Sequence, residues 1–201
     1  MKKIIGLLCA AAMTFTVFAA PKTGVDGEMP TTTPFVLDDF EEGMYMIAVR
    51  DGWDAFGNVF MKTQFSTESK TAKSWTGKGN CGVLEYAAHE GKSGQGCLYE
   101  CSDMIENNWK DYKYMTVKVN NPNDYPVSMQ LFTKTGSNYQ WGSSPEAPSI
   151  APGEHTIVFV LNSSTVAIPS KIMQFGFAFY IGQKVDASNV MIDDITLWTK
   201  K

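Results

Sequence analysis

Apolar and polar side chains alternate along most of the chain beyond about residue 35. The clearest example is a run in which Phe175, Phe177 and Phe179 are separated by Gly176 and Ala178. Successive side chains of a β-strand point to opposite faces of its sheet, so this spacing is typical of a half-buried strand. The pattern predicts that the three phenylalanines pack into a core and that the residues between them face outward.

Similar β-rich runs recur along the chain and are separated by turn signals such as Asn121-Pro122-Asn123-Asp124. The predicted strands are Phe35–Phe40, Gly82–Tyr86, Gly96–Cys101, Tyr114–Asn120, Val127–Thr133, His155–Leu161, Met173–Ile181 and Val190–Trp198. A short helical turn is expected only between Cys101 and Tyr112. Because no long amphipathic run separates the strands, the pattern predicts an all-β fold, a β-sandwich or jelly roll of two antiparallel sheets.

The first residues have the layout of a cleaved secretory signal. A pair of lysines precedes the apolar stretch 4–18, which ends in Ala19-Ala20-Pro21. We therefore expect a signal peptide at 1–20 and a protein that is secreted, extracellular or periplasmic. A lipid anchor at Cys9 is disfavoured because bulky leucines precede it. No other run approaches the ~20 apolar residues that span a bilayer, so membrane insertion is not expected.

Composition changes at the start of the predicted domain. Residues 21–34 are rich in Thr, Pro and Gly and lack periodicity, so they are interpreted as a flexible lead-in to one domain at 35–201. The chain has 17 basic and 21 acidic residues, a formal net charge of −4, and no basic patch. This balance disfavours nucleic acid and anionic membrane surfaces as partners.

Three cysteines remain after the predicted signal: Cys81, Cys97 and Cys101. In an oxidising compartment two of them can pair, but the sequence does not choose the connectivity. Zinc binding is the competing interpretation. It needs a fourth ligand, and His89 and His155 lack the spacing of a structural zinc site, so a disulfide or buried thiols are favoured.

Two acidic segments stand near the ends of the predicted domain. Asp38-Asp39-Phe40-Glu41 and Asp193-Asp194 are both set inside apolar, β-branched runs. A charge in such a run needs a partner, a hydrogen bond or a metal. One arrangement satisfies both segments, namely pairing of the first and last strands around a shared acidic spot.

Aromatic and amide side chains are the candidates for ligand binding. Aromatic rings can stack on the flat apolar faces of a ligand, and planar polar groups can bond its hydroxyls. Tyr139, Gln140 and Trp141 follow a Gly-Ser-Asn turn, and Tyr180 alternates with the core phenylalanines and so faces outward. The alternative is that these aromatics belong to the core, as most aromatics of a sandwich do.

The order of motifs along the chain resembles the galactose-binding-like β-jelly-roll carbohydrate-binding modules, above all family 11, the β-glucan binders. The motifs are L-D-D-F-E, G-V-L-E-Y, W-K-D-Y-K-Y-M-T-V-K-V, V-S-M-Q-L-F, P-G-E-H-T-I-V-F-V, F-G-F-A-F-Y and V-M-I-D-D-I-T-L. The resemblance covers about residues 35–198. It implies a secreted non-catalytic protein that binds a polysaccharide or oligosaccharide.

The resemblance also assigns residues. It implies a structural Ca²⁺ held by Glu41 and Asp193, with Asp39 and Asp194 as helpers, in keeping with the preference of calcium for oxygen ligands. It places Tyr180 and the polar residues Asn138 and Gln140 in a sugar-binding cleft. The charged cleft residues of the family are replaced here by Ser137, Asn138 and Gln140, so the glycan stays open.

Two alternatives remain. Glycoside hydrolysis needs two carboxylates across a cleft, and Glu85 with Glu100 is the only pair that stands out. No nucleophile motif such as G-x-S-x-G is present, so an enzyme is not expected. A structural or interaction protein with an assembly partner is the second alternative, because flagellar sheath proteins resemble this chain in their D-D-F-E starts and I-D-D-I-type ends.

Overall fold

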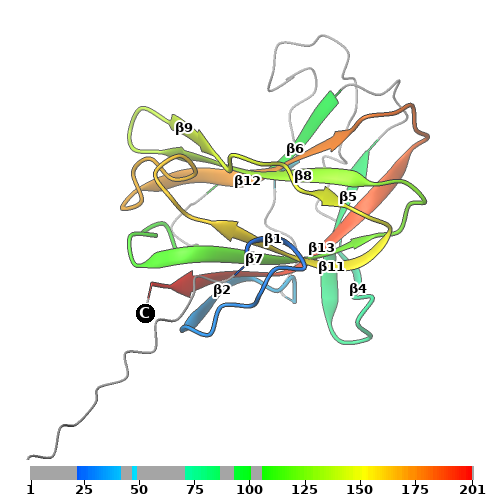
Figure 1. The fold of residues 1–201 in the computed structure, drawn as a ribbon, viewed down its shortest axis with the longest axis horizontal. Coiled ribbons are helices and arrows are strands. Elements are labelled where there is room, and N and C mark those ends of the chain that lie inside the picture. Colours follow the sequence, from blue (N-terminus) through cyan, green and yellow to red (C-terminus); the bar gives the residue numbers. More distant parts are fainter. Residues whose placement is uncertain (1–21, 42–46, 49–70, 87–92, 101–105, 201) are drawn as a thin grey trace, which may run out of the picture.

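The strands form two antiparallel sheets stacked face to face, as Figure 1 shows. The structure is a computed structural model and describes residues 22–41, 47–48, 71–86, 93–100 and 106–200. Within these ranges there is no helix, and in particular none long and apolar enough to cross a bilayer. The all-β sandwich predicted from the alternation is confirmed.

Sheet A has the strand order β1-β11-β7-β13-β5-β4, and β2 also pairs with β13. These strands are β1 (Gly24–Val25), β2 (Pro34–Asp38), β4 (Thr71–Lys73), β5 (Asn80–Tyr86), β7 (Tyr112–Asn121), β11 (Gly153–Val160) and β13 (Ser188–Thr199). Sheet B has the order β10-β8-β12-β6-β3, and β9 pairs with β8. Its strands are β3 (Ile47–Ala48), β6 (Ser93–Glu100), β8 (Val127–Thr135), β9 (Gln140–Ser143), β10 (Ser149–Ile150) and β12 (Ile172–Ile181).

Every predicted strand is present, with ends that differ by a few residues. The sequence pattern missed the short strands β1, β3, β4, β9 and β10, which are too brief to show a period. β1 lies inside the expected lead-in, where it pairs with β11. The expected helical turn is wrong for the described residues 106–112. There the chain turns at Lys110 and Asp111, and the Tyr112 amide donates to the Trp109 carbonyl at 3.1 Å.

The core lies between the sheets and contains the predicted phenylalanines. Phe175, Phe177 and Phe179 of β12 are all buried. Trp109 packs its ring edge against Phe175, with ring centroids 5.1 Å apart. Phe159 of β11 reaches Phe177 across the interlayer space at 6.2 Å. Burial of these rings joins the two sheets into one hydrophobic unit.

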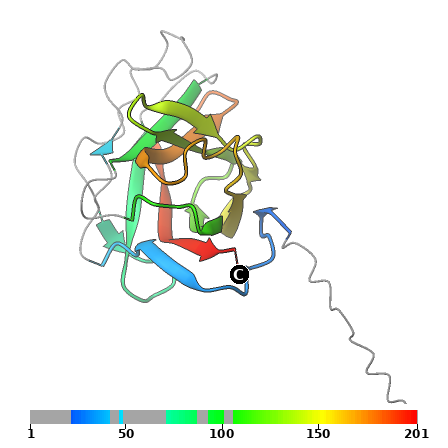
Figure 2. The same ribbon diagram turned by 90° about the vertical axis from the view of Figure 1, so that its left-hand side faces the viewer.

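The first and last long strands lie side by side in sheet A. β2 pairs with β13 from Pro34 opposite Trp198 to Asp38 opposite Ile195, and the end-on view in Figure 2 shows the two strands together. Directly after β2, the fully buried Phe40 turns into the core. A Cβ at Gly82 would lie 2.7 Å from the ring of Phe40, so a glycine is required for this ring to fit.

One of the three cysteines can be placed fully. Cys81 is buried in β5 and carries a free thiol, whose pKa is raised by burial and by the charge of Asp193. The side chain of Cys97 and the whole of Cys101 lie outside the described part of the chain. The prediction of a disulfide, whose connectivity the sequence left open, is therefore not tested for Cys97 and Cys101.

Candidate functional site

The outer face of sheet B is built from the positions of β8 and β12 that alternate with the core. Across these strands Tyr180 lies opposite Ser128, Ala178 opposite Gln130, Gly176 opposite Phe132 and Gln174 opposite Lys134. On the other side of β12, Tyr180 and Ala178 lie opposite Gly94 and Gly96 of β6. Small residues therefore leave the middle of this face low, and larger side chains stand at its sides.

Tyr180 lies on this face, as the alternation predicts, and is half buried. Its hydroxyl donates to Gln130 Oε1 at 2.9 Å, and Gln130 Nε2 donates to the Ser144 carbonyl at 2.7 Å. Burial raises the pKa of the Tyr180 hydroxyl, so the group is protonated at neutral pH. Both polar ends of the Gln130 amide are thus used in holding the phenol.

Trp141 lies further along the same face, on the short strand β9. Trp141 pairs with Lys134 of β8, and its ring stacks on Phe132 with centroids 4.9 Å apart and an interplanar angle of 9°. Phe132 is almost covered, whereas 42% of Trp141 stays exposed. The stack therefore presents one flat indole, held in place by a second ring beside it.

Gly142 allows β9 to approach the neighbouring loop. A Cβ at Gly142 would lie 2.5 Å from the Thr165 carbonyl oxygen, so only a glycine fits. The Ser143 amide donates to the Ser164 carbonyl at 3.0 Å, and the Thr133 hydroxyl donates to the Thr165 carbonyl at 2.6 Å. These contacts anchor the strand that carries Trp141.

The remaining predicted binding residues lie at the turn between β8 and β9. Tyr139 has a φ of 53° and is 49% exposed, and its amide donates to the Gly136 carbonyl at 3.2 Å. Asn138 and Gln140 are exposed beside it. The structure thus brings Asn138, Tyr139, Gln140 and Trp141 together.

Tyr180 stands apart from this group. The β8 residues opposite Tyr180 and Trp141 are Ser128 and Lys134, and six strand residues span roughly 20 Å. The sequence reasoning missed the two residues between them that support the aromatics, Gln130 and Phe132. Their signal was available, because both alternate with the core positions of the predicted strand Val127–Thr133.

The two acidic segments meet on the other layer. Asp39, Glu41, Asp193 and Asp194 line one cavity of about 610 Å³ together with Thr76, Lys78, Gly79 and Lys118. The cavity lies where β13 changes partners, since its first half pairs with β5 and its second half with β2. A β-bulge in β13 between Asp193 and Thr196 adds a residue at this point, and Asp194 has a positive φ of 46°.

Each carboxylate of this cavity has a protein partner. The buried Asp193 accepts from the Ser74 hydroxyl at 2.9 Å and from the Asp194 amide at 2.8 Å. Burial raises the pKa of Asp193, while these two hydrogen bonds act in the opposite direction. Glu41 Oε1 accepts from the Asn80 amide at 2.7 Å, and Asp39 Oδ1 accepts from the Glu41 amide at 3.2 Å.

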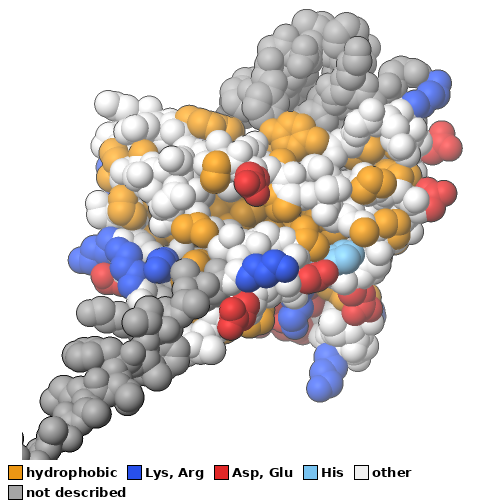
Figure 3. All heavy atoms as spheres, viewed as in Figure 1, with side chains coloured by type: hydrophobic (Ala, Val, Ile, Leu, Met, Phe, Trp, Pro, Cys, Tyr) orange, Lys and Arg blue, Asp and Glu red, His pale blue; other side chains and the backbone are white. Residues whose placement is uncertain are grey.

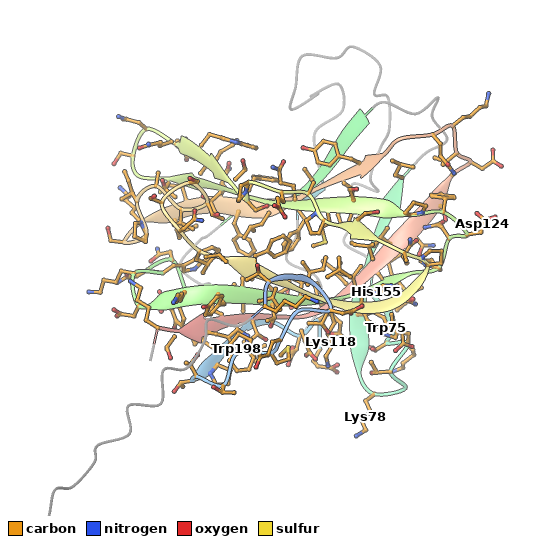
Figure 4. The ribbon with its side chains drawn as sticks, in the orientation of Figure 1. Trp75, Lys78, Lys118, Asp124, His155 and Trp198 are labelled. Atoms are coloured by element: carbon orange, nitrogen blue, oxygen red, sulfur yellow. The ribbon has the colours of Figure 1, made fainter. Side chains whose placement is uncertain are left out.

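Lys118 supplies a positive charge to the same cavity. Its ammonium forms an ion pair with Asp194 Oδ2. Figure 4 shows Lys118 at the sheet itself, whereas Lys78 points away at the tip of the turn between β4 and β5.

The calcium predicted at Glu41, Asp193 and Asp39 can be compared with these contacts. Within the described residues, no group of three His, Cys, Asp or Glu side chains is close enough to hold a metal. The oxygens of Glu41 and Asp193 are directed at protein donors, and an ammonium stands beside Asp194. The calcium prediction stays a prediction, and the geometry weighs against it.

The two carboxylates considered for hydrolysis lie on different layers. Glu85 belongs to β5 of sheet A, and Glu100 belongs to β6 of sheet B. Their backbones thus place them on opposite sheets of the sandwich, and their side chains lie outside the described part of the chain. Nothing in the strand arrangement brings them together across one face.

Comparisons with known proteins identify the fold. No protein-family model and no curated protein matches the chain. Among solved structures, it is similar to a family 11 carbohydrate-binding module from Clostridium thermocellum in complex with a β-1,3-1,4-mixed-linked tetrasaccharide. The two are 13% identical with a TM-score of 0.58, and the match covers 85% of this chain and 98% of that module.

Two other modules show the same likeness. One is a family 28 module specific for non-crystalline cellulose, 16% identical over 84% of this chain and 96% of the module, with a TM-score of 0.55. The other is a family 27 module from Caldicellulosiruptor saccharolyticus in complex with mannohexaose, 12% identical over 84% and 98%, with a TM-score of 0.54. The chain therefore has the β-sandwich fold of carbohydrate-binding modules similar to family 11, as its motif order indicated.

Proposed function

We propose that this protein is a secreted, non-catalytic module that binds a polysaccharide or oligosaccharide on the outer face of sheet B. The observation that carries the proposal is the exposed, flat indole of Trp141, which is stacked on Phe132 and held on an anchored strand. A rigid aromatic surface with neighbouring amides is what recognition of a sugar ring and its hydroxyls requires.

The residues have separate roles in this proposal. Trp141 and Tyr180 stack on sugar rings at two places along the face. Asn138 and Gln140 bond hydroxyls beside Trp141, and Tyr139 extends the aromatic surface at the turn. Because roughly 20 Å of strand separates the register positions of the two aromatics, an extended chain can contact both at once.

The ligand class is supported by chemistry and by likeness. Most charged side chains visible in the space-filling view of Figure 3 lie over sheet A and at the right-hand end of the sandwich. The residues proposed to contact the ligand carry no formal charge, which suits a neutral glycan. The three solved modules are described with a mixed-linked β-glucan fragment, non-crystalline cellulose and a manno-oligosaccharide, so we propose a β-linked glycan of this kind, with β-glucan as the first choice.

Affinity electrophoresis tests the proposal. The wild-type protein is run through gels that contain soluble β-glucan, mannan or other plant and microbial polysaccharides. Retardation that is lost in Tyr180→Ala or Trp141→Ala supports the proposed face. The matched control is Phe35→Ala, which removes an exposed aromatic ring of sheet A and should leave retardation unchanged.

Absence of retardation with every glycan would contradict the proposal. Size-exclusion chromatography of the same protein addresses the structural alternative. Large homo-assemblies or hetero-assemblies, together with no retardation, would favour an interaction protein of the sheath type.

A further inference from the structure

The hydrogen bonds around Gln130 form a relay that begins in the loop after β9. The Ser144 amide donates to the Leu131 carbonyl, and the Ser144 hydroxyl donates to the Glu146 carbonyl, both at 2.8 Å. The backbone of Ser144 is therefore fixed in a buried position. Its carbonyl accepts from Gln130 Nε2 at 2.7 Å, which leaves Gln130 Oε1 to accept from the Tyr180 hydroxyl at 2.9 Å.

These hydrogen bonds determine whether the Tyr180 hydroxyl donates or accepts. Only an amide nitrogen can donate to the Ser144 carbonyl, so the amide oxygen must face Tyr180. The Tyr180 hydroxyl donates its single proton to Gln130, so it can meet a glycan hydroxyl only as an acceptor. Resting on the proposed function, we infer that Gln130 is a positioning residue that fixes the Tyr180 ring on the outer face of sheet B and makes its hydroxyl an acceptor for a glycan hydroxyl.

A double-mutant cycle on Tyr180→Phe and Gln130→Leu tests the inference. Tyr180→Phe keeps the ring and removes only the hydroxyl. Each single variant should bind glycan about three- to tenfold more weakly, the size expected for one hydrogen bond. The double variant should bind no more weakly than the weaker single variant, because both changes break the same relay.

The same four proteins are unfolded in denaturant without any glycan. The two substitutions could be coupled in the free energy of unfolding but additive in the free energy of glycan binding. That result would overturn the positioning role, although the hydrogen bond between Tyr180 and Gln130 would still exist. Wild-type affinity in Gln130→Leu would also overturn it. Gln130→Glu gives a further readout, because a carboxylate can still accept from the Tyr180 hydroxyl although it cannot donate to the Ser144 carbonyl. Its affinity should therefore lie closer to that of wild type than the affinity of Gln130→Leu does, and an affinity no better than that of Gln130→Leu would count against the acceptor role of position 130.

Failure of the proposed function looks different from failure of this inference. If no glycan binds the wild-type protein, both fall. If glycan binds and Tyr180→Ala binds equally well, the proposed face is wrong. If Tyr180→Ala loses binding and Gln130→Leu does not, only the relay is wrong.

A second inference rests on the carboxylates of sheet A. Four of them line one cavity, and among its described lining residues the cations are Lys118 and Lys78. Lys118 forms an ion pair with Asp194 at the bulge, and its backbone lies opposite Asp193 in the register of β7 and β13. We infer that the ammonium of Lys118 balances the charge of Asp194 beside the buried Asp193 and joins β7 to β13, so that the domain closes without a bound metal.

Thermal unfolding with and without calcium tests this second inference. The wild-type protein is treated with a chelator and then given CaCl₂, and its midpoint should not move. Lys118→Met leaves the carboxylates without their ammonium, so its midpoint should fall and should then rise on addition of CaCl₂. Lys118→Arg keeps the charge and should remain insensitive to calcium.

Two outcomes would overturn the second inference. One is a wild-type midpoint that rises with CaCl₂, as mass action requires for a metal that binds only the native state. The other is a Lys118→Met protein that is as stable as wild type and does not respond to calcium. The calcium response of the wild-type midpoint still tests the inference if Lys118→Met does not fold.

Discussion

Outside the shared core, the two sheets differ in the side chains that they present. The outer face of sheet B presents Trp141 and Tyr180, supported by Phe132 and Gln130. Sheet A presents the carboxylate cavity, in which each of the four described carboxylates accepts from a protein donor. Exposed aromatic rings remain available for contact with a ligand. Carboxylates that already accept from protein donors contribute instead to closure of the fold.

Substitution of Phe40 should have the largest effect and should act on stability alone. Phe40 belongs to the acidic segment after β2 and is fully buried. Phe40→Ala should lower the free energy of unfolding by about 3–5 kcal/mol, the usual cost of emptying such a site. Chemical denaturation measures this loss. Folded Phe40→Ala should bind glycan with wild-type affinity, and a parallel loss of binding would break the separation of the two regions.

Removal of Tyr180 should act mainly on binding. Tyr180→Ala should weaken glycan binding by about 2 kcal/mol, roughly thirtyfold, if the ring is an anchor of the site. Isothermal titration with the glycan selected by electrophoresis measures the change. Phe35→Ala in sheet A is the matched control. Equal losses in the two variants would mean that binding is not confined to sheet B.

A smaller effect is expected at the turn that carries Tyr139. Its backbone has a φ of 53°, a conformation that costs an ordinary residue about 1 kcal/mol relative to glycine. Tyr139→Gly should therefore stabilise the fold by up to about 1 kcal/mol in denaturant unfolding. If Tyr139 also contacts the glycan, binding will weaken as stability rises, which separates the two roles in one variant.

The smallest effect should be a pH dependence at the edge of sheet A. The Asp26 carboxylate lies 2.8 Å from His155 Nδ1, and this hydrogen bond lowers the pKa of Asp26 below its usual value of 3.8. A lowered carboxyl pKa stabilises the native state above pH 3.8, and this contribution is lost as the pH falls through the lowered value. Because Asp26 is largely exposed, the gain is small.

Comparison of wild type with Asp26→Asn isolates this contribution. The difference in unfolding free energy should be present at neutral pH and should shrink as the pH falls below 3.8. Glycan binding should not follow the same pH course. A difference that grows at acid pH would contradict the assignment.

The sequence predicted the features that follow from the alternation of side chains along a strand. It missed the features that depend on contacts between residues far apart in the chain. The alternation of Phe175 to Phe179 specified both the core and the outward position of Tyr180, because each residue reverses direction in a strand. β9 has only four residues, so its pairing with β8 depends on the fit of Gly142 against the Thr165 carbonyl. No periodicity reveals such a fit.

The acidic segments show the same limit. Their apolar surroundings indicated that they need partners, and pairing of the first and last strands was the arrangement expected to satisfy both. The pattern could not reveal that Lys118 lies opposite Asp193 in the register of β7 and β13. Long-range register, in this case shifted by a bulge, determines which charge stands beside Asp194.

The first and last strands of the described chain, β1 and β13, both belong to sheet A. Gly24 and Thr199 therefore both lie in that layer, and the outer face of sheet B is directed away from it. A protein immobilised on a sensor surface through its C-terminal end would display Tyr180 and Trp141 to the solution. The same polarity would let a neighbouring domain or a cell-surface tether hold the molecule without covering the face proposed to bind glycan.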